Sequence, residues 1–579
     1  MSATPSPGPF DPVVAALEIR SLIESIPLFA WQAILLGAVA VSIAILYRVA
    51  RPGGRWGQRL RTRFVLGLPW GTLLGLGVVV IVYLFVQGGL GNQYDPVSLP
   101  FRATSYAYPL GVLLAGFSHL GWGHLLGNLL SGLVYGSIAE YAWSHYPTDR
   151  GSQSFTVRLS NPFVRIGLFT GGIVLAGLVT AAFSWGPIIG FSGVVYALAG
   201  FALVCYPIAT IVAVAGWSHL WHLWGTFVDP YSIAEPTVRY SGVGWANTAV
   251  QGHAFGFLIG ILVAAVVIRR RDRSADPGRI WLATMVYAIA NGLWSIYWYL
   301  GNNQYVRLEG IGTAVLFILA GLIVLAVSGS DRPLLDRFPG IDVSPGQFEF
   351  PSGRRIAAGV IVFSLIGMSM VGAAVNLSAP SGVDMPENAV EIRDYQVAYV
   401  ENVTNQQLAV VDVPFLDQVT AVRTSGVVVY SEQRNLWHQV VSKRALEARG
   451  SERVLLGGIG WRQDVAAYRA GWSVIGGNVT YRVFLRPGGG DERLVYTSNP
   501  AIADVILSNR TVTIRPAREA FEVVVARDNE TLGARPLPDD GGNVTVGGIR
   551  FDRSSQELYA SINGTQLRVA SRRVPPTRQ

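Results

Sequence analysis

Long apolar runs constrain this chain more than any other feature of its sequence. A helix needs about 18 or more apolar residues to cross roughly 30 Å of hydrocarbon. Runs of that kind lie near residues 28–47, 66–88, 110–143, 164–185, 190–206, 207–224, 247–268, 279–300, 308–328 and 356–376. Only 14% of the 579 residues are charged, against about 25% in soluble domains. We therefore exclude a fully soluble chain and predict a polytopic α-helical membrane protein with about ten transmembrane helices.

The arginines orient these predicted spans. Basic loops of multispanning proteins face the cytoplasm, and here the arginines gather near residues 48–63, 158–165, 269–271 and 332–355. The intervening loops at 91–109, 225–246 and 301–307 hold one arginine each. This alternation places both termini outside the cell, in a multi-pass protein of the cell membrane. It also ties the net charge of +8 to topology, so no nucleic-acid partner is expected. No cleaved signal peptide is predicted.

The chain changes character from about residue 378 onward. Short runs of β-branched and aromatic residues, such as Val427–Tyr430 and Phe521–Val525, alternate with Gly, Asn, Asp and Pro, which is typical of strands and turns. We predict an extracellular β-rich domain of one or two sandwich units, in which Gly488–Gly490 form a hairpin loop rather than a phosphate cradle. Sequons occur only from Asn376 onward, and they predict N-glycosylation at Asn376, Asn402, Asn478, Asn509, Asn529, Asn543 and Asn563.

Three clusters of polar residues interrupt the predicted spans, where such side chains are costly unless they find partners or a wet cavity. In the first cluster, His124 and Asn128 are four residues apart and share one face of a helix. The competing interpretation is a polar contact that joins two helices.

The second cluster surrounds Ser192. Pro187 and Gly190 precede a new apolar run, so Ser192 is predicted at a helix amino terminus, where free N–H groups and the positive end of the dipole point outward. A serine N-cap is the simpler interpretation, whereas a nucleophile here has its own N–H ready to hold an oxyanion. Tyr196 lies one turn later on the same face. The G-x-S-x-G pattern of soluble hydrolases is absent.

The third cluster combines a histidine with two glycines. Gly256 and Gly260 are four residues apart, and small residues at this spacing let two helices approach closely. His253 lies one turn earlier on the same side, so it is predicted to sit against a neighbouring helix. A packing role for this histidine is the competing interpretation.

Taken together and in this order, the three clusters resemble the rhomboid intramembrane serine proteases. The resemblance covers about residues 70–268 and rests on the motifs H-x-x-x-x-H-x-x-x-N at 119–128, G-x-S-G-x-x-Y-A-L at 190–198 and H-x-x-G-x-x-x-G at 253–260. The stretch from Gly136 to Glu140 also resembles the family's G-x-x-x-E pattern.

This resemblance implies an endopeptidase that cleaves transmembrane segments of membrane proteins in contact with membrane lipid, without a cofactor or metal. Ser192 would be the nucleophile and His253 the general base. His124, Asn128 and the Ser192 amide would form the oxyanion hole. Supporting roles would fall to His119, Tyr196, Gly190, Gly193, Gly256 and Gly260, with Tyr196 packed against His253.

The resemblance also divides the chain. We expect an N-terminal segment with one extra transmembrane helix, a rhomboid-like six-helix core, three additional transmembrane helices and the β-rich domain, with bounds 1–65, 66–268, 269–377 and 378–579. Leu110–Gly111 stand where the family often carries a Trp-Arg pair, which leaves the anchoring of that loop open. Residues 225–246 are expected to cap or gate the entrance, and His219 and His222 to belong to an interfacial aromatic belt.

Three other functions stay open at this point. A non-catalytic rhomboid-like protein would bind membrane clients without cutting them. A transporter fits the number of spans, but the chain lacks corresponding halves. Zinc hydrolysis lacks an H-E-x-x-H motif, and the single cysteine, Cys205, excludes a Cys-rich metal site and an intramolecular disulfide.

Overall fold

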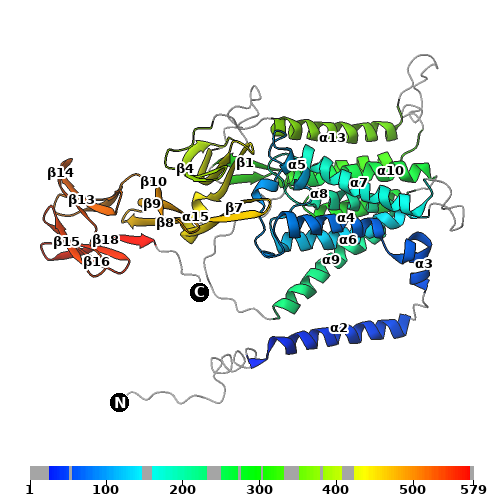
Figure 1. Ribbon diagram of the computed structural model, residues 1–579, viewed down its shortest axis with the longest axis horizontal. Coiled ribbons are helices and arrows are strands. Elements are labelled where there is room, and N and C mark those ends of the chain that lie inside the picture. The colour runs from blue at the N-terminus through cyan, green and yellow to red at the C-terminus, as the bar shows by residue number, and fades with distance from the viewer. Residues whose placement is uncertain are drawn as a thin grey trace.

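A bundle of helices and a β-rich domain make up the protein, and the β-rich domain lies at one end of the bundle (Figure 1). The computed structural model describes residues 25–50, 55–146, 159–230, 249–271, 275–301, 304–331, 351–377, 383–406 and 423–573.

The centre of the bundle is helix α8 (Ser192–Cys205), in which every residue from Val194 to Val204 is buried. A helix that is apolar on all sides is expected to be enclosed by others, and α8 packs most extensively against four neighbours. These are α6 (Trp122–Trp143), α7 (Pro162–Phe183), α9 (Pro207–Val228) and α10 (Val250–Arg270). The helix α4 (Trp70–Ile81), continued by η2 (Val82–Val86), packs on α6 and α7.

Further helices surround this core. They are α2 (Leu28–Ala50), α3 (Arg55–Arg63), the short η1 (Val65–Gly67) and α5 (Pro109–Ala115), and, after α10, α11 (Pro277–Ala290), α12 (Glu309–Ser328) and α13 (Gly353–Leu377). The long run at 110–143 is thus divided into α5 and α6, and α9 starts at Pro207, whose fixed φ suits the first position of a helix.

The number of long apolar helices is smaller than the sequence predicts. Within the described ranges, five helices are long and apolar enough to span a membrane, namely Leu28–Val49, Pro162–Phe183, Val250–Arg270, Glu309–Ser328 and Gly353–Leu377. The apolar run at 279–300 does not stay helical. It leaves α11 at Ala290, turns at Gly292 with a φ of 67°, and forms a hairpin of β1 (Tyr297–Gly301) with β2 (Gln304–Arg307). The protein is therefore a helical membrane protein. The described residues show five candidate spans and not the predicted number of about ten.

Within its described residues, the C-terminal domain contains three antiparallel sheets. The first has the order β3-β4-β5-β6, the second β10-β9-β8-β18-β17-β16-β15 with β7 also paired to β8, and the third β11-β12-β13-β14. The strands of the first sheet and its neighbours are β3 (Val390–Ile392), β4 (Tyr395–Thr404), β5 (Arg423–Ser431), β6 (Leu436–Ser442), β7 (Ser451–Gly458), β8 (Trp461–Val474), β9 (Val479–Pro487) and β10 (Arg493–Thr497). The others are β11 (Ala501–Ile506), β12 (Thr511–Pro516), β13 (Phe521–Arg527), β14 (Glu530–Pro536), β15 (Asn543–Val546), β16 (Ile549–Ser554), β17 (Glu557–Ile562) and β18 (Thr565–Arg573).

Two main hydrophobic clusters fill this domain. One joins buried residues of β3 to β10, including Val397, Val429 and Val483. The other joins buried residues from the end of β8 to β18, including Val523 and Phe551. The long strand β8 contributes to both, so it connects two sandwich-like units. Among its described residues, this domain has one helix, α15 (Lys443–Arg449). Gly488–Gly490 lie in the β9–β10 hairpin, as predicted.

The predicted glycosylation sites fall into two groups in the structure. Asn376 is fully buried at the end of α13, and its Nδ2, the atom that a glycan would modify, donates a hydrogen bond of 2.9 Å to the carbonyl of Ala182. A glycan does not fit that packed position. The other six are exposed, and glycosylation there stays a prediction: Asn402, Asn478, Asn509, Asn529, Asn543 and Asn563.

The β-rich domain is attached to the loop between α4 and α5. Leu99, in the short η3 (Leu99–Phe101), belongs to the hydrophobic core of the domain. Val97 lies against Gly457 of β7, where a Cβ would come within 2.7 Å of a Val97 methyl group. Asp95 accepts a hydrogen bond of 3.2 Å from Arg462 and also pairs with Arg453.

Two further polar contacts complete this attachment. Arg102 lies 3.0 Å from Nε2 of His438. Burial, together with the charge of Arg102, holds the pKa of His438 well below its ordinary value of 6.5, so the neutral ring accepts the hydrogen bond that arginine can only donate. Arg434 donates to the Tyr108 hydroxyl at 2.8 Å and is paired with Asp394. The β-rich domain thus anchors the loop that lacks the Trp-Arg pair.

Candidate active site

A serine and a histidine from two helices meet inside the bundle. Ser192 is the first residue of α8, and His253 lies in the first turn of α10. The Ser192 Oγ and the His253 Nε2 are 2.8 Å apart, a hydrogen-bond distance. The His253 Nδ1 is buried and has no hydrogen-bond partner. The imidazole is therefore placed to accept the hydroxyl proton, and no carboxylate holds its other nitrogen.

The orientation of His253 comes from packing instead. The ring of Tyr196 stacks on the ring of His253, with centroids 4.2 Å apart and planes inclined by 11°. The Tyr196 hydroxyl donates to the backbone carbonyl of Asn291, at the end of α11, at 3.2 Å. Tyr196 is thus held at both ends, and it limits the rotation of the imidazole.

Close contact between α8 and α10 brings these two residues within reach. A Cβ on Gly256 would lie 2.1 Å from the carbonyl oxygen of Gly193, and one on Gly260 would lie 1.9 Å from that of Ala197. A Cβ on Gly193 would in turn lie 2.9 Å from the Thr180 Oγ1 of α7. Larger side chains at Gly256 or Gly260 would push α8 and α10 apart, and the serine would leave the histidine.

Possible donors for an oxyanion surround Ser192. The first N–H groups of a helix have no partner within it, and Ser192 begins α8. His124 and Asn128 line the same cavity as Ser192. Gly190 has a φ of 130°, which L side chains rarely adopt, and a Cβ there would lie 2.7 Å from the His124 ring. Only glycine therefore lets the chain pass His124 and enter α8.

Behind these residues lies His119, which is fully buried. Its Nε2 is 3.0 Å from the Asn128 Nδ2, and its ring meets that of His124 edge to face at a centroid distance of 4.9 Å. Because amide nitrogen only donates, the His119 Nε2 accepts this hydrogen bond, and it fixes the direction of the Asn128 amide.

The sequence patterns did not identify Gln87, which holds His119 in place. The Gln87 Oε1 accepts from the His119 backbone N–H at 2.8 Å. Its Nε2 donates to the carbonyls of His119 and Val97, each at 2.8 Å. Val97 is the residue that packs against the β-rich domain, so Gln87 connects the attached loop to His119 and thereby to Asn128. A polar residue at the end of an apolar run was the only signal in the sequence.

Replacing Gln87 with leucine should therefore slow any reaction that uses the Asn128 amide. Leaving buried polar groups unpaired costs about 1–3 kcal/mol, so we expect kcat to fall about 10- to 100-fold. KM should stay unchanged, because Gln87 does not line the cavity that contains Ser192. Steady-state kinetics on a transmembrane reporter would test this. A rise in KM with an unchanged kcat would contradict the positioning role.

The pattern that ends in Glu140 belongs to the opposite end of the bundle. The buried Glu140 carboxylate accepts hydrogen bonds of 2.7 Å from the backbone N–H groups of Gly71 and Thr72, and it lies 2.6 Å from the His145 Nε2. It holds α4 against α6 and is not part of the cavity around Ser192.

Other predicted features lie away from this cavity. His219 and His222 are exposed on α9. Residues 231–246, most of the segment expected to cap the entrance, lie outside the described residues. Within the described part of the chain, no group of three His, Cys, Asp or Glu side chains is close enough to hold a metal ion.

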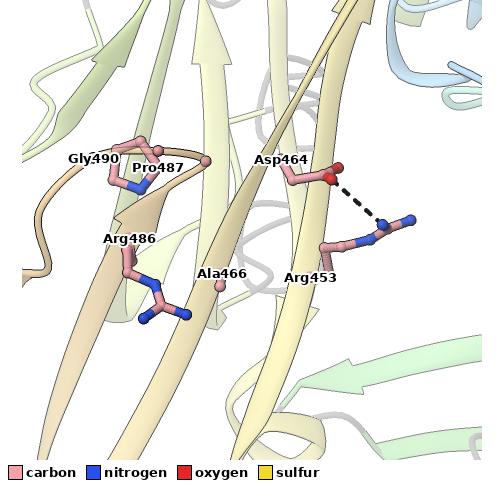
Figure 2. Close-up of a pocket in the computed structure, with 8 residues that line it drawn as sticks. Arg453, Asp464, Ala466, Arg486, Pro487 and Gly490 are labelled. Carbon is pink, nitrogen blue, oxygen red and sulfur yellow. Dashed lines mark hydrogen bonds and ion pairs between the residues drawn. The ribbon is translucent and has the colours of Figure 1, made fainter.

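A hollow of about 380 Å³ on the β-rich domain is lined by the Gly488–Gly490 loop and by Arg453 and Arg486. In Figure 2, Arg453 points toward Asp464, with which it forms an ion pair of 3.3 Å. No serine, cysteine or histidine lines this hollow, so it holds no nucleophile–base pair like that of Ser192 and His253.

Comparison with known proteins supports the same region. Residues 108–270 match the family described as "Rhomboid domain". No curated protein and no solved structure matches the chain. The matched residues hold Ser192, His253, His124, Asn128 and His119. We conclude that this protein carries a rhomboid domain in a helical membrane region, followed by a C-terminal β-rich domain.

Proposed function

We propose that this protein is an intramembrane serine endopeptidase that cleaves transmembrane segments of other membrane proteins. The observation that carries the proposal is the 2.8 Å contact between the Ser192 Oγ and the His253 Nε2. A nucleophile within hydrogen-bond reach of a base, which is itself held by a third group, is the arrangement that acyl transfer requires. Tyr196 takes the place of that third group.

In the first half of the reaction, the Ser192 Oγ attacks a peptide carbonyl carbon while the His253 Nε2 takes its proton. The negative charge moves to the carbonyl oxygen, where the Ser192 N–H, the Asn128 Nδ2 and His124 can donate to it. Collapse of this intermediate breaks the C–N bond. The leaving amine takes the proton from His253, and the acyl group stays on the Ser192 Oγ.

In the second half, water attacks the acyl-enzyme and gives its proton to His253. The Ser192 Oγ then leaves, recovers the proton and frees the carboxylic acid. Ser192, His124 and Asn128 line a cavity of about 270 Å³, which leaves room for this water. The site lies at the same end of the bundle as the β-rich domain, and we propose that this end faces the cell exterior.

Labelling with a fluorophosphonate tests the proposal, because this probe forms a bond only with an activated serine. Wild-type protein should be labelled, and Ser192→Ala and His253→Ala should not. Ser364→Ala, which removes an exposed serine of α13, is the control and should label as the wild type does. Absence of labelling in folded wild-type protein would favour a non-catalytic client-binding protein instead.

A further inference from the structure

The cavity that contains Ser192 has one wall that lies outside the matched residues 108–270. Its lining comes from α6, α8 and α11, and α11 follows the rhomboid domain in the sequence. The part contributed by α11 consists of Tyr287 and Asn291. These two residues are four apart, so they share one face of the helix end.

The facing wall on α6 is a row of residues at the same spacing. Gly123, Gly127, Ser131 and Tyr135 line the cavity one turn after another. A Cβ added to Gly123 or Gly127 would meet no atom within 4 Å. The glycines are therefore not needed for helix packing, in contrast to Gly256 and Gly260, and they leave open space beside Ser192.

The α11 wall is fixed by aromatic packing. Tyr287 stacks on Phe257 of α10, with centroids 5.1 Å apart and planes inclined by 3°. Its ring also meets Tyr135 and Tyr196 edge to face, each at 5.7 Å. The Asn291 Nδ2 donates to the Tyr287 carbonyl at 2.9 Å. The wall that faces α6 is thus rigid and connected to Tyr196, which holds His253.

The helix α9, by contrast, does not provide this wall. Its outer half is exposed, with Leu220 57% and Trp224 50% accessible, and its end stands away from the other helices (Figure 1). It contacts α6, α8 and α11. These three helices line the cavity near Ser192, and no residue of α9 does.

We propose that the substrate's transmembrane segment reaches Ser192 from the side, through the cleft between α6 and α11. This inference rests on the proposed function. A membrane-spanning substrate is an apolar helix whose backbone groups are all paired, so the peptide to be cut must unwind where polar partners exist. The cleft offers such partners in Ser131 and Asn291, and its glycines admit a helix side chain close to the nucleophile.

Cysteine crosslinking tests the path directly, because the chain has one cysteine, Cys205. In a Cys205→Ala, Ser192→Ala background, single substitutions Gly127→Cys, Asn291→Cys, Leu220→Cys and Gly171→Cys would be tested. The partner is a transmembrane reporter with one cysteine beside its scissile peptide. Gly127→Cys and Asn291→Cys should form disulfides with the reporter. Gly171→Cys, on α7 where a Cβ also meets open space, should not.

The proposed path would be overturned if Leu220→Cys on α9 formed crosslinks and Asn291→Cys formed none. It would also be overturned if none of the four variants formed a crosslink. Cleavage of the same reporter by the wild type is scored separately. A reporter that the wild type cuts but that crosslinks only to α9 would disprove the α11 wall and leave the proteolytic function intact.

A second measurement fills the cleft. Gly127→Leu should lower reporter cleavage by about tenfold or more, since the leucine occupies the space that the substrate needs, while fluorophosphonate labelling of Ser192 persists. Gly171→Leu is the matched control and should cleave within about twofold of the wild type. The proposal would be contradicted if Gly127→Leu cleaved the reporter at the wild-type rate, or if both variants lost the same fraction of that rate.

Discussion

Replacing Ser192 with alanine is expected to abolish cleavage of a transmembrane reporter, with a fall in kcat of about 10⁶-fold. The hydroxyl that forms the acyl-enzyme would be gone, and water cannot take its place at the same distance from His253. Replacing His253 with alanine should reduce cleavage to a similar level, because a neutral hydroxyl without a base is a poor nucleophile. The measurement is the amount of shortened reporter that forms over time in proteoliposomes.

The sharper form of this prediction concerns the double variant. Two residues that act as one unit do not have additive effects, so Ser192→Ala with His253→Ala should cleave no more slowly than either single variant. A double variant whose loss equals the product of the two single losses would show that the residues act independently. Substantial cleavage by Ser192→Ala would remove the proposed mechanism altogether.

Replacing Asn128 with alanine is expected to lower kcat about 10²- to 10³-fold, which corresponds to about 2.7–4 kcal/mol. The Asn128 amide is buried, with 7% of the residue exposed, and it is aimed by the contact with His119. Because its hydrogen bond forms chiefly in the transition state, KM should change little. Fluorophosphonate labelling should become slower but remain detectable.

The control for this substitution is another asparagine of the membrane region. Asn161 accepts a hydrogen bond from the Phe163 N–H at the start of α7, at the end of the bundle remote from Ser192. Asn161→Ala loses a helix cap, which costs about 1 kcal/mol of stability, but it should leave kcat unchanged in folded protein. An Asn128→Ala variant with kcat like that of Asn161→Ala would exclude Asn128 from the oxyanion hole.

Much of the local structure could be predicted from the sequence, and the errors have identifiable causes. The start of α9 at Pro207 follows from a local preference, because the fixed φ of proline suits the first position of a helix. The predicted span at 279–300 was too long, since apolar residues alone do not distinguish a spanning helix from a shorter one that continues into the β1–β2 hairpin. Asn376 met the sequon rule, yet its burial depends on the position of α13 beside Ala182.

The sequence by itself determined which segments are apolar enough for a membrane, which residues share a helix face, and that a β-rich domain follows. These properties are local, because they depend on side chains a few residues apart along one helix or strand. Only the tertiary structure decided that Gln87 meets His119, that Tyr287 and Asn291 reach the cavity of Ser192, and that the β-rich domain attaches to the loop from Asp95 to Tyr108. Such contacts depend on how whole helices and sheets pack against one another, and no single segment carries that information.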